Sequence, residues 1–237
     1  MWKKYELELQ MTGQFAASLP RSREEIKAML ENRMPVKPPV DYIPIDELTE
    51  EVYGKVAPVF PDQSVTPAGE EEEELQYGWA TFCRNEEGLY YEGRCVRGHL
   101  KDCANQVKDV DIPALKVVKK KDGEEGQITA LKAKVANKVY VMTDVIPLML
   151  DGVQAKEIAG TQQRFVQVMT RMGPRSTIKY LDYLEKPVLT FQLNVLDDGI
   201  ITEDILDAIF EYGSVHGLGQ ERSQGWGRYT YTIKELK

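Results

Sequence analysis

The order of its periodic segments limits the fold of this chain more than any other feature. Residues 5–11 alternate apolar and polar side chains, the pattern of a strand with one buried face. Residues 94–107 instead repeat apolar side chains at helical spacing. Thr202 predicts the start of a second helix, and residues 228–233 form the last expected strand. Further strands are expected at 132–135, 139–142, 164–169 and 188–195.

With the middle hairpins treated as insertions, these elements follow the order βαββαβ. That order predicts an α+β protein with a ferredoxin-like, or RRM-like, core, in which an antiparallel sheet carries both helices on one face. A proline- and glutamate-rich segment at about residues 35–76 predicts an insertion with one short helix at 45–53. The length of 237 residues favours a single domain spanning 1–237 that carries this insertion and the extra hairpins.

Composition narrows the possible partners of such a fold. The net charge of -8 disfavours a protein that coats duplex DNA by bulk attraction, so any nucleic-acid site must be local. No apolar run approaches the roughly 20 residues that span a bilayer, and the first residues lack the apolar core of a signal peptide. We therefore expect a cytoplasmic protein with no membrane partner, whose three cysteines remain thiols.

A glycine-rich loop between the last helix and the last strand is the main functional candidate. From residue 217 it reads Gly-Leu-Gly-Gln-Glu-Arg-Ser-Gln-Gly-Trp-Gly-Arg. Glycines at this density allow positive φ and close approach of the backbone to a ligand. Arg222 and Arg228 are expected to bind phosphate oxygens, and Trp226 to stack on an unpaired base. The alternative is a helix C-cap at Gly217 or Gly219 followed by a glycine bulge.

The loop resembles the glycine-rich loop of the RAMP superfamily, the RRM-like proteins of CRISPR systems that bind guide RNA as processing nucleases or as repeating backbone subunits. Residues 90–101 are similar to the segment that leads into the first core helix of that family. A hairpin expected at about 160–178, with Arg164 and Arg171, is the candidate for the thumb of the backbone subunits, and an ordinary basic surface hairpin is the alternative. The resemblance implies that nucleic acid is bound by Arg94, Arg97, Lys101, Arg222 and Arg228, in a loop shaped by Gly217, Gly219, Gly225 and Gly227.

Two departures from the family pattern bear on catalysis. Residues 12–18 hold neither the aspartate of target-cutting backbone subunits nor the histidine of processing nucleases. The sequence therefore favours a non-catalytic protein that binds single-stranded RNA, or single-stranded DNA, and assembles along the strand as a homo-oligomer or a ribonucleoprotein subunit. Two alternatives stay open: a metal-independent ribonuclease using His216 or His99, and a phage structural or assembly protein. A stand-alone prophage-encoded relative would fit the same pattern.

A metal site is the last possibility that the sequence raises. Cys95, His99 and Cys103 follow one another at i, i+4 and i+8, a spacing that could share Zn²⁺ with Cys83 as a fourth ligand. Structural zinc sites more often pair their ligands in short knuckles from two elements. Buried thiols and a hydrogen-bonded histidine are the preferred interpretation, so neither a metal nor a cofactor is expected.

Overall fold

A computed structural model describes residues 1–20, 26–27, 45–56, 78–108, 115–118, 125–170 and 173–236. The chain divides into two compact units. The first comprises Met1–Phe15, Tyr91–Ala155 and Glu185–Lys237, and the second comprises Ala16–Tyr90 and Lys156–Leu184. The glycine-rich loop belongs to the first unit.

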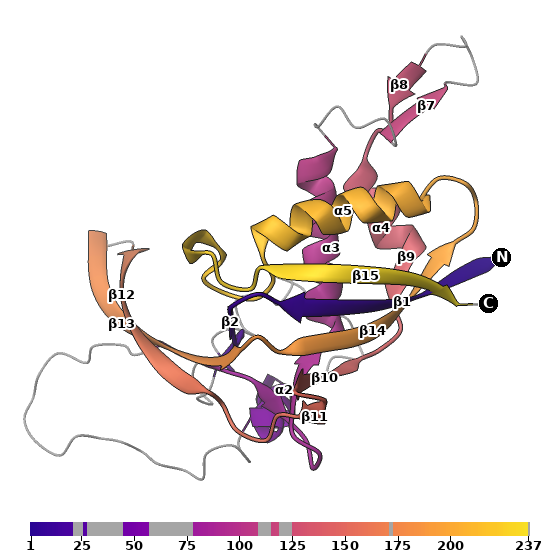
Figure 1. Ribbon diagram of the computed structural model, residues 1–237. Coiled ribbons are helices and arrows are strands. Elements are labelled where there is room, and N and C mark those ends of the chain that lie inside the picture. The colour runs from indigo at the N-terminus through magenta and orange to yellow at the C-terminus, as the bar shows by residue number, and fades with distance from the viewer. Residues whose placement is uncertain are drawn as a thin grey trace, which may run out of the picture. The chain divides into compact units, whose positions relative to one another are not determined.

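The first unit is built on an antiparallel sheet in which β1 (Trp2–Met11) is central. It pairs with β14 (Val188–Leu196) on one side and with β15 (Tyr229–Leu236) on the other (Figure 1). The far side of β14 pairs with β9 (Val139–Val141) at one end and with β10 (Val145–Leu150) at the other. The strand order β15-β1-β14-β10 is that of a ferredoxin-like sheet, with β9 and β10 together in the position of its second strand.

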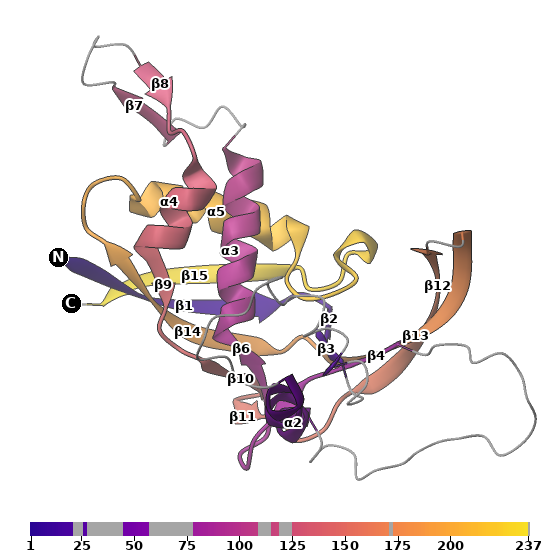
Figure 2. The same ribbon diagram turned by 180° about the vertical axis from the view of Figure 1, so that it is seen from behind.

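Three helices accompany this sheet. Figure 2 shows α3 (Gly93–Val107) crossing the strands on one face, with α4 (Leu131–Lys138) and α5 (Glu203–His216) beside it. Thr202 caps α5 as predicted, because its hydroxyl oxygen accepts a hydrogen bond from the backbone N–H of Ile205 at 3.4 Å. The expected α+β class and βαββαβ order are confirmed.

The strand predicted at residues 132–135 is wrong, because these residues lie in α4. Leu131 and Val135 are both buried and are four residues apart, so they form one helical face. Over such a short window a helical period and an alternating period place apolar residues at the same positions. The remaining strands of this unit are two-stranded hairpin elements outside the core order: β7 (Lys116–Val118) with β8 (Glu125–Gln127), and β11 (Val153–Gln154) with β10.

Alternating burial along β1 gives the sheet one apolar and one polar face. Tyr5, Leu7, Leu9 and Met11 are at most 2% exposed and face the helices. Their neighbours on β14 are also buried: Leu189, Phe191, Leu193 and Val195. The opposite face is formed around Glu6, Glu8, Gln10, Thr190, Gln192, Thr230, Thr232 and Lys234, and none of these side chains is aromatic.

The second unit contains a long antiparallel hairpin of β12 (Gly160–Thr170) and β13 (Gly173–Glu185). The hairpin expected at about 160–178 is therefore present and extends further. β13 also pairs in parallel with β4 (Gly78–Thr81), which pairs with β3 (Leu19–Pro20). Phe165 on β12 is 79% exposed.

A small apolar cluster lies in the same unit beside α2 (Ile45–Val56), the helix expected within the insertion. The cluster consists of Leu19, Ile26, Cys83 and Tyr90, with Val52 and Tyr53 of α2 packed against it. A short hairpin joins β5 (Cys83–Arg84) to β6 (Leu89–Glu92). The rest of the insertion at 35–76 lies outside the described residues.

Candidate nucleic-acid interface

The glycine loop, residues 217–228, is a folded element with its own backbone hydrogen bonds. Leu218 donates from its N–H to the carbonyl of Gly227 at 2.8 Å, and Gly227 donates to the carbonyl of Gln14 at 2.8 Å. All four glycines have positive φ, between 69° and 88°. At Gly227 a Cβ atom would lie 1.8 Å from the Leu218 carbonyl oxygen, so no other residue fits there.

Two apolar side chains anchor the loop. Leu218 is 2% exposed and Trp226 is 7% exposed. The expectation that Trp226 stands clear of the core as a platform for base stacking is therefore wrong, because its indole is buried. The two glycines that flank Trp226 let the backbone turn its side chain inward, so the indole is not presented as a stacking surface.

The two arginines of the loop differ in their surroundings. Arg228 is exposed, and its guanidinium lies over Gly225, where an added Cβ would be 3.6 Å from Cζ. Its backbone carbonyl is held by Thr12, which donates to it from N–H at 2.9 Å and from the hydroxyl at 3.1 Å. No ion pair to Arg228 occurs within the described part of the chain. Its charge is therefore available to a ligand.

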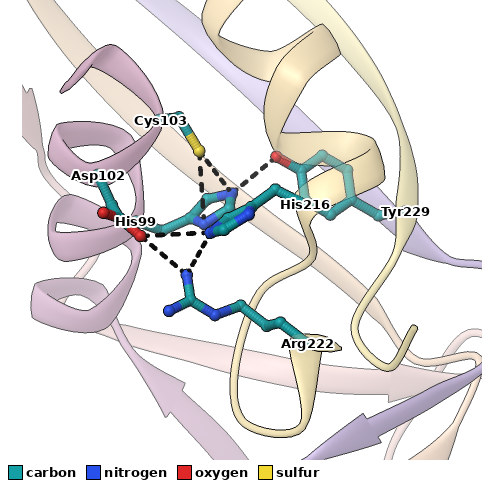
Figure 3. Close-up of polar contacts among 6 residues, drawn as sticks. All are labelled: His99, Asp102, Cys103, His216, Arg222 and Tyr229. Atoms are coloured by element: carbon teal, nitrogen blue, oxygen red, sulfur yellow. Dashed lines mark hydrogen bonds and ion pairs between the residues drawn. The ribbon is translucent and has the colours of Figure 1, made fainter. Parts of the chain in front are cut away.

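Arg222, by contrast, already has partners on α3 and α5. Its Nη1 atom lies 2.9 Å from Oδ2 of Asp102 and 2.7 Å from Nε2 of His216 (Figure 3). All three side chains remain partly exposed, at 37%, 42% and 29% for Arg222, Asp102 and His216. Burial acts to raise the pKa of Asp102, but Arg222 and His216 beside the carboxylate outweigh it and lower that pKa below its ordinary value.

A buried polar cluster of His99, Cys103 and Tyr229 lies next to Arg222, Asp102 and His216. Nε2 of His99 lies 2.9 Å from the hydroxyl of Tyr229, and Sγ of Cys103 lies 3.6 Å from the same nitrogen (Figure 3). Gly213 leaves room for it, since a Cβ there would lie 2.2 Å from the Tyr229 hydroxyl. Burial, with the charges of His216 and Arg222, lowers the pKa of His99 to about 3, and burial raises the pKa of Cys103 to about 12. The cluster is neutral and structural at physiological pH.

His216 contacts both the partly exposed ion pair of Arg222 and Asp102 and the buried cluster around His99. Its ring stacks on His99, with centroids 6.4 Å apart, and on Tyr212, with centroids 5.3 Å apart. Its Nε2 faces Asp102 and Arg222 rather than an adjacent serine or cysteine nucleophile. A ribonuclease role for His216 thus stays an untested alternative.

The basic residues of α3 do not gather at the loop. Arg94 donates from Nε to the carboxylate of Glu92 at 2.9 Å. Arg97 donates to the carbonyl of Ala136 on α4 at 2.9 Å, and its guanidinium lies over the ring of Tyr140 at 5.2 Å. Lys101 is half-buried. The residues of α3 that do lie near the loop are Asp102, which contacts Arg222, and the buried pair His99 and Cys103.

The candidates on the hairpin belong to the second unit. Arg164 donates to the side-chain oxygen of Gln162 at 3.3 Å. Arg171 lies outside the described residues. The structure thus brings Arg222 and Arg228 into one loop and leaves the hairpin arginines as separate predictions.

Sequence reasoning missed Asp102, Tyr229 and Gly213. Asp102 is an acidic residue among the basic residues of α3, and this contrast in the sequence could have indicated an ion pair. Tyr229 and Gly213 carried no such signal, because their importance depends on contacts between α3, α5 and β15.

The described residues show neither a metal-binding cluster nor a membrane-spanning helix. Among them no group of three or more histidine, cysteine or acidic side chains is placed to hold a metal ion. Cys83, Cys95 and Cys103 form no disulfide. None of the described helices is both long enough and apolar enough to cross a membrane.

Comparison with known proteins gives structural neighbours only. The sequence matches no protein-family model and no curated protein. A chain of the type III-B Cmr-beta complex bound to cognate target RNA aligns with a TM-score of 0.40 and 11% identity; the alignment covers 100% of this chain, which spans 61% of that one. A chain of a type IV-B CRISPR complex aligns with a TM-score of 0.37 and 11% identity, covering 98% of this chain and 90% of the other. At these values the likeness assigns neither a family nor a function.

Proposed function

We propose that this chain is a non-catalytic protein that binds single-stranded nucleic acid, RNA by preference, through the phosphate backbone at the glycine loop. The observation that carries the proposal is the exposed guanidinium of Arg228 on a loop whose backbone is held by its own hydrogen bonds. A rigid loop with positive-φ glycines lets phosphates approach closely, and an arginine fork binds them with charge-assisted hydrogen bonds. The resemblance of the loop to that of RAMP proteins supports the same ligand.

Binding at this loop should depend little on sequence. Trp226 is buried, and the polar face of the sheet carries no aromatic side chain at its central positions. Trp226 and the central positions of the polar face therefore offer no platform for stacking bases; the exposed aromatic rings of this face, Trp2 and Tyr140, lie at the end of the sheet where β1 begins. Recognition through phosphates alone predicts similar affinity for different homopolymers and a strong dependence on salt.

Assembly along the strand is the second part of the proposal. The β12–β13 hairpin presents the aromatic ring of Phe165, which is 79% exposed. An exposed aromatic residue on a long hairpin suits contact with a neighbouring subunit or with the bound strand. This hairpin is our candidate for the thumb of the backbone subunits, with Arg164 and Arg171 as its charged contacts.

The test compares Arg228→Ala with a variant that removes an equal charge elsewhere. Lys234 is exposed on the polar face of β15, so Lys234→Ala is the matched control. Affinity for an oligouridylate is measured by fluorescence anisotropy at salt concentrations from about 50 to about 200 mM. Arg228→Ala should weaken binding by about tenfold and reduce the salt slope by about 0.7, whereas Lys234→Ala should change neither.

Three outcomes would contradict the proposal. These are failure of the wild-type protein to bind at the lowest salt concentration, equal behaviour of the two variants, and tighter binding of duplex DNA than of the single strand. Reproducible cleavage of the RNA that is lost in His216→Ala would replace the non-catalytic assignment by the ribonuclease alternative.

A further inference from the structure

One nitrogen of Arg222 serves two acceptors. Nη1 lies 2.9 Å from Oδ2 of Asp102 and 2.7 Å from Nε2 of His216 (Figure 3). Arginine keeps its charge in proteins, and Nη1 carries two hydrogens, so one hydrogen can point at each partner. An Nε2 atom that accepts a hydrogen bond carries no proton. With Nε2 as the acceptor from Arg222, the ring proton of His216 lies on Nδ1.

This arrangement sets two acceptors against each other. Nε2 of His216 lies 3.3 Å from Oδ2 of Asp102, and in this tautomer neither atom has a hydrogen to donate. The hydrogens of Arg222 are what hold the pair together. If Arg222 moved away, a nitrogen lone pair would face a carboxylate, and a proton on Nε2 would turn this repulsion into a charge-assisted hydrogen bond.

We propose that phosphate binding at the glycine loop is coupled to the uptake of one proton by His216. A phosphate of the bound strand draws the guanidinium of Arg222 away from Asp102, a proton from solvent adds to Nε2, and the imidazolium replaces Arg222 as the cation beside Asp102. Asp102 then has one cationic partner in both states. The inference rests on the proposed function, because it requires that the loop bind phosphates.

The other groups around His216 do not compete for this proton. On α3 it faces Asp102 and His99, on α5 it faces Tyr212, and in the loop it faces Arg222. His99, which also contacts Tyr229 of β15, has a pKa lowered to about 3, chiefly by burial. Of the two histidines in the chain, His216 is the one in contact with both Asp102 and Arg222.

The coupling has a defined sign. A complex that holds one more proton than the free protein becomes more stable as the pH falls. Affinity should rise by up to about tenfold per pH unit where uptake is complete, and by less where His216 is already protonated in the free protein.

The experiment measures binding and proton uptake with the full chain. Anisotropy titrations with an oligouridylate run from about pH 8 to about pH 5.5 at constant ionic strength. Calorimetry in two buffers of different ionisation enthalpy counts the protons taken up. The wild-type protein should bind more tightly at low pH and take up as much as one proton per site.

Two variants separate the linkage from general charge effects. His216→Gln should remove both the pH slope and the proton uptake, and Asp102→Asn should reduce both, because the imidazolium loses its counter-ion. Glu8→Gln removes a carboxylate from the exposed polar face and should retain the wild-type slope. Circular dichroism confirms that each variant is folded.

The outcomes distinguish this inference from the function on which it rests. Binding with no pH dependence, or a full slope in His216→Gln, would overturn the coupling alone; it would mean that Arg222 binds phosphate without leaving Asp102. Absence of binding at every pH would overturn the proposed function and the coupling together.

Discussion

Substituting one loop glycine tests whether the glycine loop is a rigid element. In Gly227→Ala the new Cβ would lie 1.8 Å from the carbonyl oxygen of Leu218, and the residue would have to keep φ near 69°. The backbone must move, which breaks the hydrogen bonds from Leu218 to Gly227 and from Gly227 to Gln14. The left-handed conformation costs about 1–2 kcal/mol, and each lost bond costs about 0.5–1.5 kcal/mol. We expect the free energy of unfolding to fall by roughly 2–5 kcal/mol.

Gly225→Ala is the matched control. Gly225 also has positive φ, at 82°, but the nearest atom to an added Cβ is Cζ of the Arg228 side chain, at 3.6 Å. Its cost should be limited to the backbone conformation, about 1–2 kcal/mol. Urea unfolding followed by circular dichroism gives both values. Equal destabilisation by the two variants, or none by Gly227→Ala, would refute the argument that the loop is held by its own backbone.

Two further predictions concern residues in and beneath the loop. Trp226→Ala should lower the free energy of unfolding by about 3–5 kcal/mol, because the indole is buried. Arg222→Ala should lower it by less than about 1 kcal/mol, because the ion pair of Arg222 is partly exposed. Similar values for the two variants in urea titrations would contradict the burial of Trp226. The pKa of His99 is lowered to about 3 by burial, so the unfolded state binds its proton first as the pH falls. Stability should therefore decline below about pH 6.5 by up to about 1.4 kcal/mol per pH unit. Urea titrations of His99→Gln should give a flatter profile between about pH 6.5 and 4.5, and an unchanged profile would contradict this account of His99.

The sequence predicted the core fold because each core element has a long, regular pattern. Residues 5–11 alternate over seven positions, and α5 has both a cap at Thr202 and a buried face, so neither admitted another interpretation. Residues 132–135 were too few to distinguish a strand from the helix that they form. Local periodicity determines an element only when it is longer than about one turn of helix.

The candidate site was predicted less completely. The glycines of the loop were identified correctly as positions of positive φ, since that preference is local. The partner of Arg222 was not predicted, because Asp102 is 120 residues away in sequence. Trp226 was misjudged from its glycine neighbours, although a second apolar residue, Leu218, stood at the other end of the loop.

The position of β1 has a consequence for how the protein is made. Its neighbours in the sheet are β14 and β15, and Met11 pairs with Tyr229. At a synthesis rate of about 5–20 residues per second, β1 leaves the ribosome roughly 10–45 s before its partner in β15. Until β14 has been made, the apolar side of β1 has no sheet to join, and until β15 has been made, one edge of β1 can pair with other chains. Yield in the cell should therefore depend on holding factors that shield the nascent chain, even if the finished fold is stable.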